Sequence, residues 1–142
     1  MYIEDVEQEI IDEFAMFEDW SDKYQYIIDL GKELSPMNEA NKSKENIVKG
    51  CQATVWLHAT LKDGHIYFEA DSDAMIVKGL ISLLVRVLSG RTMNEILNAD
   101  LAFIDKIGMR EHLSATRSNG LAAMIKQMKF YAIAFNSKAT QS

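Results

Sequence analysis

The sequence predicts a single α+β domain in which helices pack on a small antiparallel sheet of about three strands. Residues 3–34 and 74–135 repeat apolar side chains at spacings of three and four, which is typical of helices with one buried face. Residues 57–70 alternate instead around Asp63-Gly64, a dipeptide that favours a two-residue hairpin turn. The chain has 142 residues, of which 48% are hydrophobic, so it can bury one core without a disulfide or a structural metal.

Two helices are expected before the sheet. The first covers residues 3–17 and has a strongly acidic outer face, and the second covers residues 20–34. Pro36 ends the second helix, because the residue before a proline is forced out of the helical region. Residues 37–46 are polar and lack periodicity, which predicts a long loop. Residues 47–48 are then expected to add a short third strand.

The hairpin is expected to have one apolar face and one mixed face. A two-residue turn sets the register, because residues equally distant from the turn lie opposite each other. A hairpin with one apolar face is stable only when helices cover that face. Three cross-strand pairs form the expected apolar face: Leu57 with Ala70, Ala59 with Phe68, and Leu61 with Ile66.

The helix after the hairpin is expected to run to about Ser89 and to lie at the centre of the domain. Its side chains are apolar on nearly all sides, as in a helix surrounded by other elements. Asp71-Ser72-Asp73 offer side chains that can cap its first turn. Gly90 is the expected stop, because glycine readily adopts the left-handed conformation that follows a helix.

Three shorter signals complete the helical part. A capping box that starts at Thr92 opens a short helix. Asp100 is expected to cap another helix, which ends at Gly108. The last helix is expected to begin near Ser118, and residues 136–142 are expected to form a frayed polar tail.

Composition argues against several classes of function. The chain has 15 Lys and Arg against 21 Asp and Glu, a net charge of −6, whereas binding to nucleic-acid phosphates needs the opposite balance. The most apolar stretch, residues 74–88, contains Lys78 and Arg86 and is shorter than the ~20 residues of a membrane span. The acidic start resembles neither a secretory signal nor a transit peptide. We therefore expect residues 1–142 to form one soluble, cytoplasmic domain.

Cys51 is the only cysteine, so it can form neither an internal disulfide nor a cysteine-rich metal site. A lone cysteine is most often a small buried apolar residue. Three features favour a reactive thiol instead. Cys51 lies where a loop meets a strand, Gly50 frees the backbone before it, and Lys49 supplies a charge that would favour the thiolate. From these residues alone, a reactive and a structural cysteine are equally favoured.

The three histidines offer no evident partner for this thiol. His58 follows Cys51 along an extended chain and would lie about 23 Å away at ~3.3 Å per residue, too far for a hydrogen bond. His65 lies beside the hairpin turn, and His112 could approach Cys51 only through the fold. The acidic clusters lack the ligand pattern of a calcium loop, so no metal site is predicted.

Gly120 and Arg117 stand out near the start of the last helix. Glycine inside a helix costs about 1 kcal/mol relative to alanine, so Gly120 predicts the close approach of another segment. Arg117 has no evident partner in the sequence and, taken alone, is interpreted as a surface residue.

Four segments resemble, in the same order, the sequence blocks of the SufE family of sulfur acceptors. They are residues 20–31, residues 46–56 around Gly50-Cys51-Gln52, residues 71–80 and residues 112–121. This sequence departs from the family pattern in two places. Ala53 stands where a serine commonly follows Gly-Cys-Gln, and Ala115-Thr116 replaces a proline followed by serine or threonine.

The resemblance implies a fold similar to that of IscU-type scaffolds and a role in sulfur transfer. A SufS-type, pyridoxal-phosphate-dependent cysteine desulfurase would pass sulfur to Cys51 as a persulfide and be activated by this chain. Cys51 would then pass the sulfur to an iron–sulfur scaffold complex. The pyridoxal phosphate belongs to the partner, so no cofactor and no independent turnover are expected here. Positions that match family residues near the cysteine or the partner are Lys49, Gly50, Gln52, Asp73 and Arg117.

Two other interpretations stay open beside the sulfur carrier. A small hydrolase could use Cys51 as its nucleophile, and it would need a base beside the thiol. A non-catalytic adaptor would keep Cys51 buried for structural reasons. For a carrier, Arg117 is expected to position the thiolate or to favour it electrostatically, and both a monomer and a homodimer are compatible with the sequence.

Overall fold

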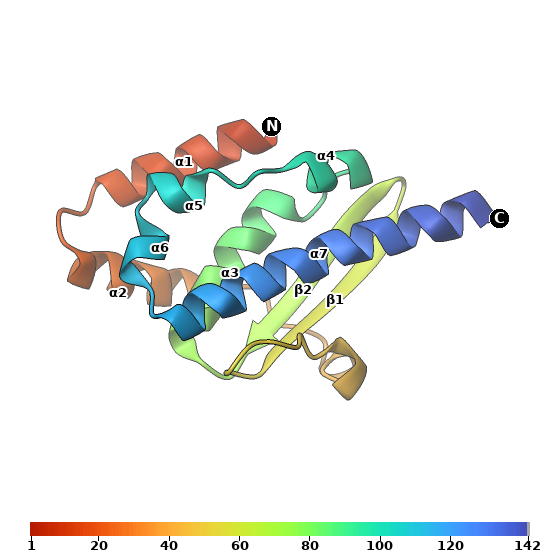
Figure 1. Cartoon of the computed structure of the whole chain (residues 1–142), viewed down its shortest axis with the longest axis horizontal. Helices are drawn as coiled ribbons and strands as arrows, with labels where there is room; N and C mark the ends of the chain where they lie inside the picture. Colours follow the sequence, from red (N-terminus) through yellow and green to blue (C-terminus); the bar gives the residue numbers. More distant parts are fainter. Residues whose placement is uncertain (142) are drawn as a thin grey trace.

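The computed structural model of the chain describes the backbone of residues 1–141 and the side chains of residues 1–136. It is mostly helical, and one hairpin forms its sheet (Figure 1). In chain order the elements are α1 (Ile3–Ala15), α2 (Trp20–Lys32), the 3₁₀ turns η1 (Glu39–Asn41) and η2 (Lys44–Asn46), β1 (Val55–Lys62), β2 (His65–Ser72), α3 (Met75–Leu88), α4 (Met93–Asn98), α5 (Phe103–Lys106), α6 (Met109–His112) and α7 (Ala115–Gln141).

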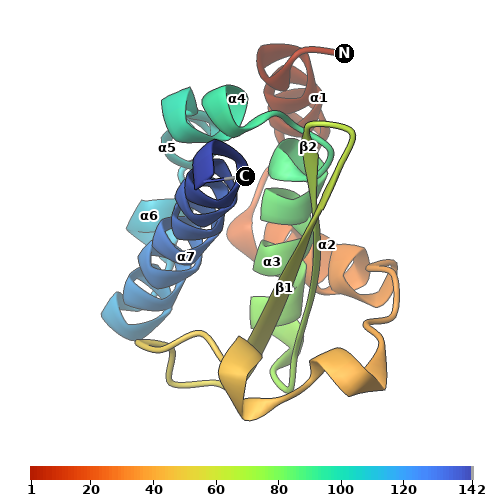
Figure 2. The same cartoon turned by 90° about the vertical axis from the view of Figure 1, so that its right-hand side faces the viewer.

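The helix α3 lies at the centre of the fold, as its apolar surface predicts. It packs against α1, α2, α7 and β2, and Leu84, Val87 and Leu88 on it are buried. In Figure 1 the long helix α7 crosses α3 and the hairpin diagonally, and in Figure 2 it lies beside α3. The N-terminal turns of α3 and α7 lie next to the residues that precede β1.

The hairpin has the predicted turn and the predicted register. Asp63 (φ 53°) and Gly64 (φ 78°) both have positive φ, as a type I′ turn requires. The side chains of the apolar face are buried, except Leu61 near the tip, which is 42% exposed. The expected pairs are all present: Leu57 with Ala70, Ala59 with Phe68, and Leu61 with Ile66.

The prediction of a third strand is wrong, because the sheet within residues 1–141 has two strands. Ile47 forms only an isolated bridge with Trp56. The polar segment before it is attached to β2 through side chains instead, since Asn41 donates a hydrogen bond to the Glu69 carboxylate. Next to the bridge, the Val48 amide donates to the Val55 carbonyl at 2.8 Å, but no strand forms there.

The start of α3 differs from the predicted cap. Asp71 and Ser72 form the end of β2, and α3 begins after Ala74 with no hydrogen bond from the side chain at the cap position. The Ser72 hydroxyl accepts a hydrogen bond from the Ala74 amide at 3.2 Å. Gly90, with φ 81°, follows the end of the helix as predicted. The Asp73 carboxylate therefore contacts Thr54 rather than the first turn of α3, and Asp71 reaches α3 only through its ion pair with Lys78.

The helix expected between Asp100 and Gly108 is α5, and a second short helix that was not predicted, α6, follows it. The Asp100 carboxylate accepts a hydrogen bond from the Ala102 amide at 3.2 Å, but Ala102 rather than Asp100 occupies the cap position of α5, and no side chain caps this helix. Gly108 has φ 76°, which breaks the helix, and α6 begins after it. The capping box at Thr92 is confirmed, with Glu95 as its second member.

The last helix begins at Ala115, earlier than the predicted start near Ser118. The Ser114 hydroxyl accepts a hydrogen bond from the Arg117 amide at 3.3 Å and supplies the cap that the sequence pattern did not indicate. The backbone of α7 continues to Gln141. The frayed tail expected for residues 136–142 falls mainly on residues whose side chains lie outside the described part, and it stays a prediction.

The helices α2 and α3 touch through their backbones at Gly31 and Gly79. A Cβ placed on Gly79 would lie 2.0 Å from the carbonyl oxygen of Ile27, and a Cβ on Gly31 would lie 2.7 Å from the Gly79 nitrogen. No side chain fits between the two helices at this point. Glycine is therefore required at both positions for α2 to pack on α3.

Candidate functional site

Cys51 lies in the turn before β1, against the N-terminal half of α7. Its side chain is half-buried, and Sγ donates a hydrogen bond to the carbonyl oxygen of Gly120 at 3.6 Å. A Cβ added to Gly120 would also lie 3.6 Å from Sγ. Another segment does approach Gly120, as predicted, and it is the one that carries the thiol, but at a distance that leaves room for a Cβ.

An apolar cavity of about 210 Å³ opens beside Cys51 between α3 and α7. Its polar lining residues are Gln52, Thr116 and Arg117, which are exposed to solvent. Most other lining side chains are aliphatic, and they include Val55, Ile76, Leu80, Leu84, Leu121 and Met124. The thiol thus lies at the boundary between an exposed polar border and an apolar interior.

Burial raises the pKa of the Cys51 thiol above its ordinary value. The contact with the Gly120 carbonyl acts in the same direction, because an S–H group can donate to this oxygen and a thiolate cannot. Lys49 and Arg117 are both exposed. In this arrangement burial, rather than a neighbouring cation, sets the direction of the shift, and the thiol is protonated at neutral pH.

Native Cys51 is expected to react with iodoacetamide more slowly at pH 7 than the same residue in the urea-unfolded chain. The thiolate is the reacting form, and a free thiol is only about 3% ionised at this pH. Because the native pKa is raised, the ionised fraction is smaller still and should keep increasing above pH 9. Intact-mass measurement of the alkylation rate between pH 6 and 10 gives both apparent pKa values, and a native value below the unfolded one would contradict this prediction.

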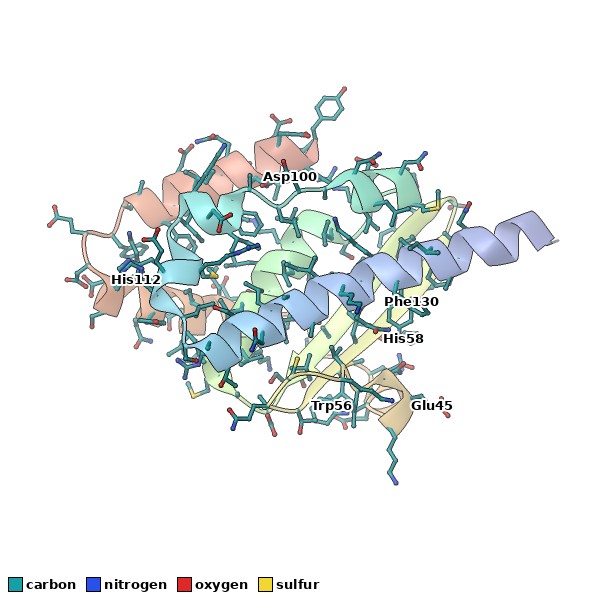
Figure 3. All side chains as sticks on the ribbon, in the orientation of Figure 1. Glu45, Trp56, His58, Asp100, His112 and Phe130 are labelled. Carbon is teal, nitrogen blue, oxygen red and sulfur yellow. The ribbon has the colours of Figure 1, made fainter. Side chains whose placement is uncertain are left out.

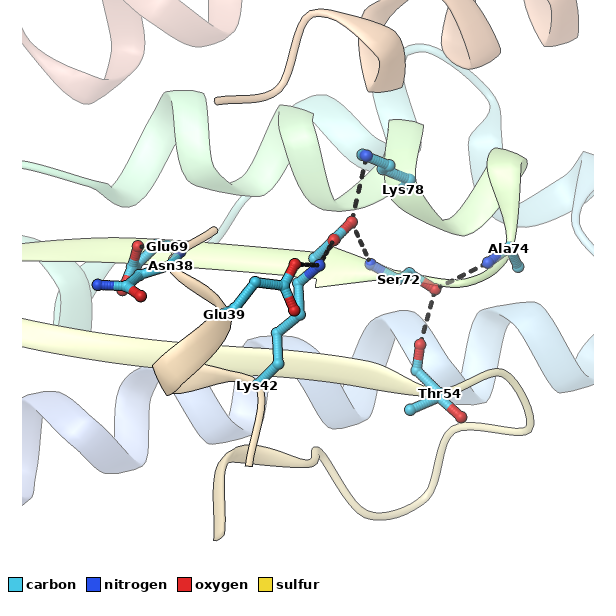
Figure 4. Close-up of polar contacts among 9 residues, drawn as sticks. Asn38, Glu39, Lys42, Thr54, Glu69, Ser72, Ala74 and Lys78 are labelled. Atoms are coloured by element: carbon cyan, nitrogen blue, oxygen red, sulfur yellow. Dashed lines mark hydrogen bonds and ion pairs between the residues drawn. The ribbon is translucent and has the colours of Figure 1, made fainter. Parts of the chain in front are cut away.

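The turn that carries the thiol is fixed at both ends. Gly50 has φ 94°, which L side chains rarely adopt, and a Cβ added there would lie 3.3 Å from the Ala123 side chain. At the other end, the Asp73 carboxylate accepts a hydrogen bond from the Thr54 amide at 3.1 Å. The Ser72 hydroxyl donates to the Thr54 carbonyl at 2.9 Å (Figure 4). Gly50 and Asp73 thus shape the turn from opposite sides.

Asp71 ties the segment before this turn to the end of β2. Its carboxylate forms ion pairs with Lys42 at 2.7 Å and with Lys78 at 3.2 Å (Figure 4). Partial burial raises the pKa of Asp71, but hydrogen bonds from Lys42, the Ser72 amide and Lys78 outweigh it and hold the pKa below its ordinary value. Sequence reasoning missed this cluster because residues 71–73 also fit a helix cap.

Asp71→Asn is expected to lower the midpoint of urea unfolding at pH 7 by about 0.3 M, a modest effect because the pairs lie close to solvent. The folded pKa of Asp71 is depressed, so the wild-type advantage is present above about pH 4 and is lost as the pH falls through the folded pKa. Urea titrations at pH 7 and pH 3 measure both effects. The matched control is Asp29→Asn, since the Asp29–Lys32 pair is exposed and 3.8 Å apart. Equal losses in the two variants would argue against the prediction.

None of the described residues that line the cavity beside Cys51 is a histidine, an aspartate or a glutamate. His112 stacks on Trp20 with ring centroids 4.0 Å apart, and it lies at the opposite end of the view in Figure 3 from His58 on β1. His65 lies at the start of β2, next to the hairpin turn. The arrangement does not provide the neighbouring base that a cysteine hydrolase needs.

Two further observations concern the described part of the chain. Residues 1–136 include no group of three or more His, Cys, Asp or Glu side chains placed to hold a metal ion. Among the helices described, none combines the length and the apolar character needed to cross a bilayer.

These features define a small α+β domain that presents one sheltered thiol beside an apolar cavity. Residues 8–132 match the sequence model of the SufE family, which is described as an Fe-S metabolism associated domain. The chain belongs to the SufE family. The resemblance found in its sequence blocks is thereby confirmed, together with a general role in iron–sulfur metabolism.

Relatives and a solved structure agree with this assignment. An uncharacterized SufE-like protein of Rhizobium meliloti (strain 1021) is 45% identical over 126 residues, which is 85% of this chain and 90% of that protein. A second one, of Rhizobium etli, is 42% identical over 127 residues and 85% of each chain. The solution structure of a hypothetical protein from Thermus thermophilus has a TM-score of 0.75 at 19% identity, covering 96% of this chain and 97% of that one. This last likeness concerns the fold alone, and it confirms the predicted α+β class.

Proposed function

We propose that this chain is a cytoplasmic sulfur carrier for iron–sulfur cluster assembly. Cys51 accepts sulfane sulfur from a pyridoxal-phosphate-dependent cysteine desulfurase, which this chain activates, and passes it to a scaffold complex. Family membership supports the link to iron–sulfur metabolism. The observation that carries the proposal is a single thiol beside an apolar cavity whose described lining holds no base. Such a thiol is suited to holding sulfur rather than to hydrolysing a substrate.

The transfer step needs no external oxidant or reductant. The Cys51 thiolate attacks the terminal sulfur of a persulfide on the donor enzyme, so a new S–S bond forms at Cys51. The S–S bond of the donor breaks, and the donor cysteine leaves as a thiolate. This thiolate can take up the proton that Cys51 lost. Because the chain has one cysteine, no second thiol of its own can attack the persulfide and release sulfide.

The half-buried thiol must become accessible for this reaction. Burial keeps it protonated in the free chain, so docking that moves the turn toward solvent would lower the pKa and release the thiolate. After transfer, the cavity of about 210 Å³ has room for the added sulfur, since it is several times the ~30 Å³ that one water molecule occupies. The residues proposed to shape the turn or to contact the donor are Lys49, Gly50, Gln52, Asp73 and Arg117.

Intact-protein mass spectrometry after incubation with a cysteine desulfurase and L-cysteine tests the proposal. We expect a gain of one sulfur atom that reductant removes and that Cys51→Ser lacks. No gain with several desulfurases, although Cys51 can be alkylated, would contradict the carrier and favour a hydrolase or an adaptor. Reaction of Cys51 with activated esters in the absence of a partner then separates these two, because only the hydrolase would turn them over.

A further inference from the structure

The outer face of α7 carries an apolar stripe in the part of the helix that is C-terminal to its contact with Cys51. Phe130 is 59% exposed and Ile133 is 50% exposed, and Figure 3 shows Phe130 on the C-terminal half of α7. A shallow groove of about 510 Å³ follows this face. Its lining includes Ala122, Ile125, Lys126, Phe130 and Ile133 on α7 and Arg110 on α6.

The charged side chains that line this groove are basic, and the two lysines lie between the apolar side chains around the helix. The helix contains no Asp or Glu from Ala115 to Gln141, although the whole chain has a net charge of −6. Lys126 is exposed and forms no ion pair within the described residues. Lys129 also lines the groove, and its Nζ donates to the Ala99 carbonyl at 2.6 Å. Arg110 is the partly neutralised member, since its Nε lies 3.2 Å from the Asp105 carboxylate. An occupant that carries negative charge beside its apolar side chains therefore fits this groove best.

The shape of the groove indicates what kind of occupant this is. The lining positions on α7 recur every three to four residues from Ala122 to Ile133, which corresponds to about 16 Å of helix at ~1.5 Å per residue. Single exposed apolar residues are common on protein surfaces, but Ile125, Phe130 and Ile133 lie on adjoining turns of one helix face, with Lys126 and Lys129 between them. A second helix laid along the stripe would cover it with its own apolar face, the usual geometry of helix-in-groove recognition.

We propose that the groove along α7 is a docking surface for an amphipathic helix of a partner protein, one that presents aliphatic side chains with Asp or Glu next to them. This inference does not depend on the chemistry of Cys51, because the groove and the cavity beside the thiol share no lining residue. Phe130 lies about 15 Å further along the helix axis than Gly120. A helix docked in the groove therefore leaves the thiol available to a separate contact.

The test uses the full chain and two synthetic helical peptides of equal length. Both carry Leu at every third and fourth position; one has Glu at the bordering positions, and the other has Lys there. Fluorescence anisotropy at low and high salt measures their affinities. We expect the acidic peptide to bind at least about tenfold more tightly than the basic one, and its affinity to fall as salt is added.

Two variants assign the binding to the groove. Phe130→Ser should weaken binding of the acidic peptide at least about tenfold. Lys126→Glu should weaken it similarly and improve binding of the basic peptide, a reversal that simple unfolding cannot produce. The matched control is Met16→Ser, which removes a side chain that is 79% exposed at the end of α1 and should bind like the wild type. Circular dichroism checks that each variant is folded.

Several results would overturn the proposal. Equal affinity for both peptides, or acidic-peptide binding unchanged by Phe130→Ser, would show that the groove does not select such a helix. Self-association in sedimentation equilibrium that Phe130→Ser abolishes would assign the face to a second copy of this chain. Capture by anionic phospholipid vesicles through the same residues would assign it to a membrane surface. Loss of sulfur acceptance by Cys51, by contrast, would leave this inference unchanged.

Discussion

Under the proposed function, Cys51→Ser is expected to reduce sulfur acceptance to zero and to leave a cysteine desulfurase at the rate it has without this chain. Serine has nearly the size of cysteine, so the turn between Gly50 and Thr54 should keep its shape. Its hydroxyl is far less acidic than a thiol and does not displace a thiolate from a persulfide. The variant should therefore separate docking from transfer.

Docking and transfer are measured in two assays on the same preparation. Alanine release by the desulfurase reports turnover, and calorimetric titration reports binding, for which we expect a Kd within about twofold of the wild type. Wild-type chain alkylated at Cys51 gives a second way of blocking the thiol. Stimulation that persists in the variant would mean that this chain activates its partner without accepting sulfur. Parallel loss of binding and stimulation would mean that serine disrupts the turn.

Gly79→Ala is expected to lower the free energy of unfolding by at least about 3 kcal/mol, or about 10 °C in Tm. Helix propensity alone favours alanine over glycine by about 1 kcal/mol. At this position, however, the added Cβ would lie 2.0 Å from the Ile27 carbonyl oxygen. Backbone atoms cannot rotate away as a flexible side chain can, so α2 and α3 would have to separate. The steric cost therefore outweighs the gain in helix propensity, and the free energy of unfolding falls.

The chain offers a matched control for this substitution. Gly120 also lies in a helix, and a Cβ added there would meet its nearest neighbour, Cys51 Sγ, at 3.6 Å, an ordinary contact. We expect Gly120→Ala to be neutral or to raise stability by up to about 1 kcal/mol. Thermal unfolding followed by circular dichroism compares the two variants. Similar behaviour of both would contradict the role assigned to the contact between α2 and α3.

The elements that the sequence predicts well are those defined by local chemistry. The Asp63-Gly64 turn sets the register of every pair in the hairpin, and the capping box at Thr92 identifies the start of α4. Predictions were wrong where one pattern fits two structures. Asp71-Ser72-Asp73 can cap a helix or end a strand, and in the fold Asp71 ends β2 and pairs with Lys42, which lies far away in the chain.

In the candidate site, too, some features are predicted by single residues and others depend on tertiary packing. Single residues are enough to select Cys51 as a candidate and to predict that another segment approaches Gly120. The contact between these two residues, however, depends on how α7 crosses the fold. The cavity has no local signature, because its walls come from both α3 and α7. Lys49 was expected to favour the Cys51 thiolate because its charge lies nearby in the sequence. Burial, which only tertiary packing sets, shifts the pKa in the opposite direction.

The hydrogen bond from Cys51 to the Gly120 carbonyl allows the thiol to be followed by infrared spectroscopy without a label. An S–H group absorbs infrared light in a region where other protein groups are nearly transparent, and a chain with one cysteine gives a single such band. Donation to a carbonyl shifts that band to lower frequency, departure of the thiol from Gly120 shifts it back, and ionisation or persulfide formation alters or removes it. The state of the thiol can therefore be followed in the unlabelled protein during each encounter with a partner.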